Sequence, residues 1–89
     1  MTELGLNEYL AANPKVVGVL SAAVSREESR ATDPNYLGWE WYDVRAYPAT
    51  LMKLVVDGLI RVNFKSNSAT CYLLGDLAAT KQALAERQT

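Results

Sequence analysis

The sequence contains no histidine and only one cysteine among its 89 residues. Without histidine, zinc sites of the Cys/His type and general acid–base catalysis by imidazole are excluded. With Cys71 alone, no disulfide can form within the chain, and this use of cysteine is typical of a reducing compartment. We therefore expect an intracellular protein that holds no metal and no cofactor.

Motifs of catalytic sites are also missing. No serine lies in a Gly-x-Ser-x-Gly elbow, and no glycine-rich loop is present to hold a phosphate. Glu27 and Glu28 are adjacent, and adjacent residues of a helix point apart, so we expect both carboxylates to be solvated. Cys71 falls in a predicted strand, where packing is a more common role than nucleophilic attack. We therefore expect no enzyme active site.

Long hydrophobic runs are absent, since no segment approaches the roughly 18 apolar residues of a membrane-spanning helix. No basic segment followed by an apolar one begins the chain, which predicts a cytoplasmic protein without membrane contact. A hydrophobic content of 49% with 21% charged residues fits a single domain over residues 1–89. Residues 85–89 carry no helix-closing signal, which would suit a domain excised from a longer protein.

A helix followed by a hairpin is predicted in the second half of the chain. Leu51, Leu54 and Val55 share one helical face, and Gly58 can adopt the left-handed conformation that closes a helix. The hydrophobic period then changes to two in residues 60–65, as in a half-buried strand. The predicted helices span residues 3–12, 14–28, 38–46, 48–57 and 76–87, and the predicted strands span residues 60–64 and 69–74.

Residues 51–60 resemble the end of the recognition helix in winged helix-turn-helix proteins. Those proteins read leucine, two variable residues, leucine, three variable residues, glycine, leucine and an aliphatic residue. The hairpin that follows resembles their wing, including the ending Tyr72-Leu73-Leu74. The resemblance implies an α+β fold with a three-helix core, a C-terminal two-stranded wing, and flanking N- and C-terminal helices.

Residues 38–46 fit two patterns. Trp39, Tyr42 and Ala46 would share a helical face, whereas Trp39, Trp41 and Asp43 would share a strand face. We favour a short helix, because a helix-turn-helix needs one at this point in the chain.

Charge is unevenly distributed along the chain. Residues 1–43 carry three basic and seven acidic groups, a net charge of −4; residues 44–74 carry four basic and one acidic group, a net charge of +3. Residues 75–89 balance at zero, which gives the total of −1. Positive charge thus gathers on the predicted recognition helix and wing, where phosphates would be bound.

The resemblance and the charge together predict a module that binds double-stranded DNA. It would be a small transcriptional regulator or an accessory domain of a larger nucleic-acid-processing protein. Thr50 and Lys53 would project toward a groove, Arg45 toward a phosphate, and the wing would lie on the backbone. The candidate DNA-binding residues are Arg45, Thr50, Lys53, Arg61, Lys65 and Asn67. For each residue alone, an ordinary solvated side chain is the competing interpretation.

A protein partner or a homodimer is the alternative, with Trp41, Met52 and Val56 as the candidate contacts. Met52 and Val56 are four residues apart and apolar, and we expect both in the core of so small a domain. If they were exposed, they would form an apolar patch suited to a partner. Leu77 and Leu84 are seven residues apart, as in a seam between paired helices.

Aromatic residues are dense in residues 36–47. A stacking platform for single-stranded nucleic acid is one interpretation of this cluster, and the hydrophobic core is the other. We expect Trp39 and Tyr42 in the core, and we expect Trp41 on the surface as an interaction anchor.

Overall fold

The computed structural model describes residues 3–87, which form five helices and one two-stranded antiparallel sheet. The elements are α1 (Glu3–Ala12), α2 (Lys15–Ser29), α3 (Trp41–Val44), α4 (Pro48–Val56), β1 (Ile60–Lys65), β2 (Thr70–Leu74) and α5 (Leu77–Arg87). The predicted α+β class is confirmed. Within residues 3–87, no helix has the length and apolarity needed to cross a membrane.

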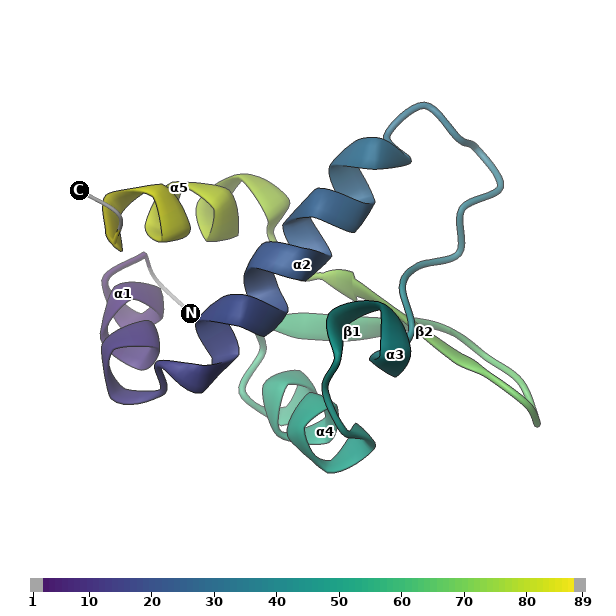
Figure 1. Ribbon diagram of the computed structural model, residues 1–89, viewed down its shortest axis with the longest axis horizontal. Coiled ribbons are helices and arrows are strands. Elements are labelled where there is room, and N and C mark those ends of the chain that lie inside the picture. The colour runs from purple at the N-terminus through teal and green to yellow at the C-terminus, as the bar shows by residue number, and fades with distance from the viewer. Residues whose placement is uncertain (1–2, 88–89) are drawn as a thin grey trace.

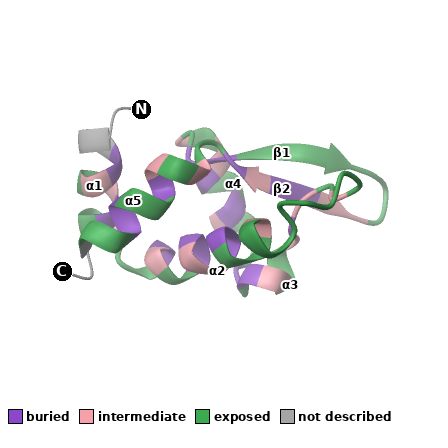
Figure 2. Cartoon of the chain, turned by 90° about the horizontal axis from the view of Figure 1, so that it is seen from above, coloured by how far each residue is buried: buried purple, intermediate pink, exposed green. Residues whose placement is uncertain are grey.

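Helix α2 runs through the middle of the molecule (Figure 1). Helices α1 and α5 lie together at one end, α3 and α4 lie toward the other, and the β1–β2 hairpin projects beyond them. Buried residues line the sides of the helices that face one another, whereas β1 and the hairpin turn are largely exposed (Figure 2). The hairpin therefore extends out of the core.

Helix α5 packs within the chain. It contacts α1 and α2, Leu84 is buried, and Leu77 is partly buried against the core. The face that we considered as a seam with another chain is therefore covered by the domain's own helices.

Helix α3 is shorter than the predicted helix 38–46. Trp39 lies outside it and forms an antiparallel bridge with Tyr72, with hydrogen bonds of 3.0 Å from Trp39 N to Tyr72 O and 2.8 Å from Tyr72 N to Trp39 O. Gly38, at φ 132°, allows this close approach. Trp39 is therefore extended, as in the strand pattern that we did not favour. Only Trp41–Val44 form the helix that we expected over residues 38–46.

Trp39 is fully buried, which confirms its predicted place in the core, and its ring stacks on Tyr72 with centroids 5.5 Å apart. The same prediction is wrong for Tyr42, which is 56% exposed. Because α3 has only four residues, it presents a single inward side chain, Val44, and leaves Tyr42 outside.

The Glu27 carboxylate joins α2 to this bridge. Its Oε2 atom accepts hydrogen bonds from Trp39 Nε1 at 3.0 Å and from Leu74 N at 2.8 Å. The expectation that Glu27 is merely solvated is therefore wrong. It is correct for Glu28, which is exposed and forms an ion pair with Lys81.

Candidate nucleic-acid interface

Helix α4 presents one buried and one exposed face. Leu51 and Leu54 are fully buried, whereas the opposite stripe exposes Lys53 together with Met52 and Val56. The expectation that Met52 and Val56 lie in the core is wrong, since they are 57% and 76% exposed. The reason is that only one side of α4 is covered by the rest of the chain. Exposure of Lys53 agrees with its predicted role.

Thr50 is half-buried on α4. It lies beside the buried Leu51 rather than at the centre of the exposed stripe. The predicted projection of Thr50 toward a groove is therefore only partly open to solvent.

The hairpin contains a bulge that changes which side chains share a face. Arg61 pairs with Leu73 and Lys65 pairs with Thr70, and the register shifts between Val62 and Phe64. Paired residues share a face and successive residues of β2 alternate, so Arg61 and Lys65 lie on opposite faces. Simple alternation along β1 would have placed them together.

Arg61 is directed toward the neighbouring loop. Its Nη1 donates a hydrogen bond to Asn63 Oδ1 at 3.2 Å, and Asn63 Nδ2 donates to the Leu37 carbonyl at 2.8 Å. Arg61 and Lys65 are both exposed but face opposite sides of the hairpin, so their joint contact with one DNA backbone stays a prediction.

Ser66 organises the hairpin turn. Its Oγ accepts hydrogen bonds from Ser68 N at 3.3 Å and Ala69 N at 3.2 Å, while its own N donates to Ala69 O at 2.8 Å. These bonds hold Asn67 at the exposed tip of the hairpin, near Lys65.

A groove separates the wing tip from the start of α4. Its walls include Trp41, Pro48, Lys65 and the turn at residues 66–69. A second, mainly apolar depression lies beside it, and we call it the aromatic hollow. Its lining residues are Trp41, Tyr42, Arg45, Ala46 and Tyr47. Trp41 lines both depressions, so they adjoin at this side chain, and its 48% exposure agrees with its predicted place on the surface.

Within residues 6–86, whose side chains the structure describes, the basic side chains of residues 44–74 form no ion pair. The ion pairs of this range include Arg26–Asp43 at 3.5 Å and Lys81–Glu28. The four basic residues of the candidate interface, all exposed and outside these pairs, are Arg45, Lys53, Arg61 and Lys65.

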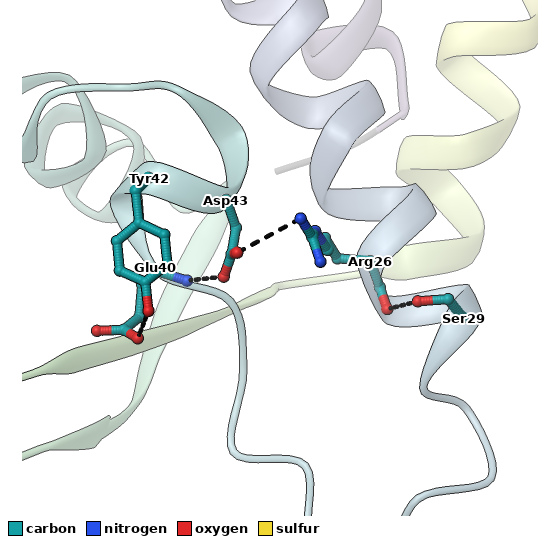
Figure 3. Close-up of polar contacts among 5 residues, drawn as sticks. All are labelled: Arg26, Ser29, Glu40, Tyr42 and Asp43. Carbon is teal, nitrogen blue, oxygen red and sulfur yellow. Dashed lines mark hydrogen bonds and ion pairs between the residues drawn. The ribbon is translucent and has the colours of Figure 1, made fainter.

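The acidic residues nearest the groove are engaged in local contacts (Figure 3). The Asp43 carboxylate accepts a hydrogen bond from Glu40 N at 2.9 Å and forms the ion pair with Arg26. The Tyr42 hydroxyl donates to the Glu40 carboxylate, and this hydrogen bond raises the pKa of Tyr42. Arg26 thus offsets the charge of Asp43, whereas Glu40 lines the groove itself, where its carboxylate accepts a hydrogen bond from the Tyr42 hydroxyl.

Asp57, the one acidic residue in the basic segment, is held at the far end of α4. It caps the C-terminus of the helix and accepts a hydrogen bond of 2.8 Å from the Tyr9 hydroxyl. Burial and this hydrogen bond raise the pKa of Tyr9 to about 12. Asp57 therefore ties α4 to α1 and is turned away from the groove at the other end of the helix.

Replacing Tyr9 by phenylalanine should lower the free energy of unfolding by about 1 kcal/mol near neutral pH, because Asp57 loses a donor. Since the Tyr9 pKa is raised in the folded state, this contribution should be complete below pH 10 and should vanish as the pH rises through about 12. Urea denaturation of both proteins over this range would measure the difference. A difference that persists at the highest pH would contradict the assignment.

Tyr47 and Pro48 were not among the predicted site residues, although both are exposed next to Arg45. The order Tyr47-Pro48 could have indicated this exposure from the sequence alone. The residue before a proline is held extended, and Tyr47 has φ −69° and ψ 152°. A side chain in that position lies outside both flanking helices, so neither helix buries it.

Cys71 is buried on β2, and burial raises the pKa of its thiol. A nucleophilic cysteine needs the opposite, an accessible thiol with a lowered pKa. Within residues 3–87, no three Cys, Asp or Glu side chains converge as a metal site would require.

No protein-family model matches the chain, and a comparison with curated proteins finds no similar sequence. Its function is therefore inferred from its own residues.

Proposed function

We propose that this chain is a winged-helix module that binds duplex DNA through α4 and the β1–β2 hairpin. The order of elements supports this proposal. Helices α3 and α4 are joined by a turn of three residues, 45–47, which is the length typical of a helix-turn-helix. The hairpin follows α4 directly and packs on it through β1. Such a module would serve a small regulator or a larger nucleic-acid-processing protein.

The observation that carries the proposal is the set of exposed basic side chains without ion-pair partners. A surface cation that lacks an acidic neighbour is free to displace counterions from phosphate. Arg45 lines the aromatic hollow, Lys65 lines the adjoining groove, and Lys53 lies further along the exposed face of α4. We assign phosphate contacts to these three residues, with Asn67 beside Lys65 at the wing tip. Arg61 lies on the opposite face of the hairpin from Lys65, so we assign it only a peripheral contact.

Titration of a labelled random duplex by fluorescence anisotropy tests the proposal. Binding should weaken steeply with salt. The double variant Lys53→Glu, Lys65→Glu should bind about tenfold more weakly or worse, and the slope of log Kd against log salt should fall by about 2. The matched control is Arg30→Glu, Lys81→Glu, which makes the same change in net charge at the end of α2 and on α5.

Equal loss in the two double variants would mean that only net charge matters, which would contradict a defined interface. Absence of duplex binding by the wild type in low salt would remove the proposal altogether.

A specific observation favours a protein partner or a homodimer as the second candidate. Met52 and Val56 expose apolar side chains four residues apart on α4, where a DNA-reading helix usually carries polar ones. If the wild-type chain fails to bind duplex, this stripe is the place to seek a protein contact, and sedimentation at high concentration would detect the homodimer.

A further inference from the structure

The aromatic hollow has a feature that duplex binding does not explain. Its three rings are exposed, with Tyr47 at 78%. Trp41 and Tyr42 meet edge to face, with centroids 5.8 Å apart. The hydrophobic core is formed by other side chains, so burial does not explain the presence of these three rings. Exposed aromatic rings gathered around one depression indicate a surface that stacks on a planar ligand.

The backbone of the turn holds this surface open. Arg45 has φ 55°, the left-handed conformation that non-glycine residues rarely adopt, and Tyr47 is extended before Pro48. Between them Ala46 is 6% exposed and occupies the inward position. Of the three turn residues, Ala46 has the smallest side chain and faces the core, whereas Arg45 and Tyr47 face outward. Strain of this kind in a non-glycine residue is common where a side chain is held for binding.

We propose that the aromatic hollow binds an unpaired nucleotide, so that the chain prefers a duplex that carries a single-stranded overhang. The base stacks on the exposed rings, and Arg45 meets the adjoining phosphate. This inference rests on the proposed function, because the paired part of the DNA is held by α4 and the wing. A base in the interior of a duplex is covered on both faces by its neighbours, so away from the duplex ends an unpaired nucleotide is needed to offer a face to the rings.

Charge decides between a nucleic acid and a peptide as the occupant. Aromatic grooves also bind proline-rich peptides, which need no cations. Here Arg45 lines the hollow and Lys65 lines the groove that shares Trp41, and neither belongs to an ion pair of residues 3–87. A strand that leaves the duplex beside the wing would pass Lys65, then Trp41, then Arg45. Phosphates and bases alternate along a single strand, so an aromatic surface with a cationic side chain at each end suits such a strand.

The test compares three DNAs of one sequence by anisotropy: a blunt duplex, the duplex with about five unpaired nucleotides at either end, and the single strand. The overhang should bind about tenfold more tightly than the blunt duplex. In Tyr47→Ala this ratio should fall to about one, whereas Tyr47→Phe, which keeps the ring, should retain it. Leu37→Ala removes an exposed apolar side chain outside the hollow and should also leave the ratio unchanged.

Tryptophan fluorescence supplies a second measurement. The chain has two tryptophans, and only Trp41 is exposed. Overhang DNA should quench its emission, and Trp41→Phe should abolish the quenching.

The outcomes separate the two proposals. Salt-dependent binding of blunt duplex with no gain from an overhang would overturn the hollow as a nucleotide site and leave the proposed function standing. Binding of single strand alone, lost in Tyr47→Ala, would support the hollow and overturn duplex recognition. Quenching by a proline-rich peptide that competes with the overhang would assign the hollow to a protein ligand instead. No binding of any DNA would overturn both.

Discussion

Replacing Glu27 by alanine is expected to lower the free energy of unfolding by about 3 kcal/mol. The substitution leaves Trp39 Nε1 and Leu74 N without the oxygen that accepts both hydrogen bonds. A buried donor that loses its acceptor costs about 1–3 kcal/mol. Glu27 is half-buried, so water can replace part of the loss, and the expected value lies in the lower half of the summed range of about 2–6 kcal/mol. Urea denaturation measures it.

The neighbouring glutamate is the matched control. Glu28 is exposed and pairs with Lys81 at the surface, so Glu28→Ala should cost less than about 1 kcal/mol. Glu27→Gln keeps an acceptor oxygen but loses the charge, and its cost should fall between the two alanine variants. Equal destabilisation by Glu27→Ala and Glu28→Ala would show that the carboxylate of Glu27 does not join α2 to the bridge.

Gly38→Ala should cost about 3 kcal/mol or more. A Cβ atom at this position would overlap the Tyr72 carbonyl oxygen and would lie 3.0 Å from the N and C atoms of Tyr72. The φ of 132° is itself unfavourable for alanine. Neither backbone can yield without breaking the two hydrogen bonds between Trp39 and Tyr72, and that movement would also draw Trp39 away from Glu27.

Replacing Gly18 by alanine should have the opposite effect on the free energy of unfolding. Gly18 lies within α2 and is exposed, and a Cβ atom added there would have no neighbouring atom within 4 Å. Alanine there should stabilise the protein by about 0.5–1 kcal/mol, because it loses less backbone entropy on folding than glycine does. Thermal unfolding of both variants would measure the contrast, and a loss of stability at Gly18 equal to that at Gly38 would refute the steric explanation.

The Gly38 variant also bears on the candidate interface. The Trp39–Tyr72 bridge connects the segment leading into α3 with the hairpin. The groove between Trp41 and Lys65 depends on that connection, since one wall comes from each side. A folded Gly38 variant should therefore bind duplex less well, even though no basic residue has been changed.

Local patterns predicted much of the fold. The spacing of Leu51 and Leu54 and the closing glycine at Gly58 located α4, and the structure places Gly58 at φ 84° directly after that helix. Alternating residues located β1. These features depend on neighbours in the sequence, because a helix buries one stripe and a strand alternates. The exposure of Arg45, Lys53 and Lys65 was likewise expected from charge.

Most of the errors concern contacts between distant segments. Met52 and Val56 are exposed because nothing packs on the outer side of α4, which no pattern within the helix could reveal. Arg61 and Lys65 lie on opposite faces because a bulge shifts the register, and a single extra residue reverses every later side chain.

The sequence by itself determined most of the helical and extended segments, where the positive charge lies, and which chemistries are excluded by the absence of histidine. Only the tertiary structure decided that Glu27 joins α2 to β2, that Trp39 pairs with Tyr72, and that the rings of Trp41, Tyr42 and Tyr47 surround a hollow with Arg45. The physical reason is that helix and strand preferences depend on residues a few positions apart. Burial, hydrogen bonding of a carboxylate and the faces left uncovered depend on which distant segments meet.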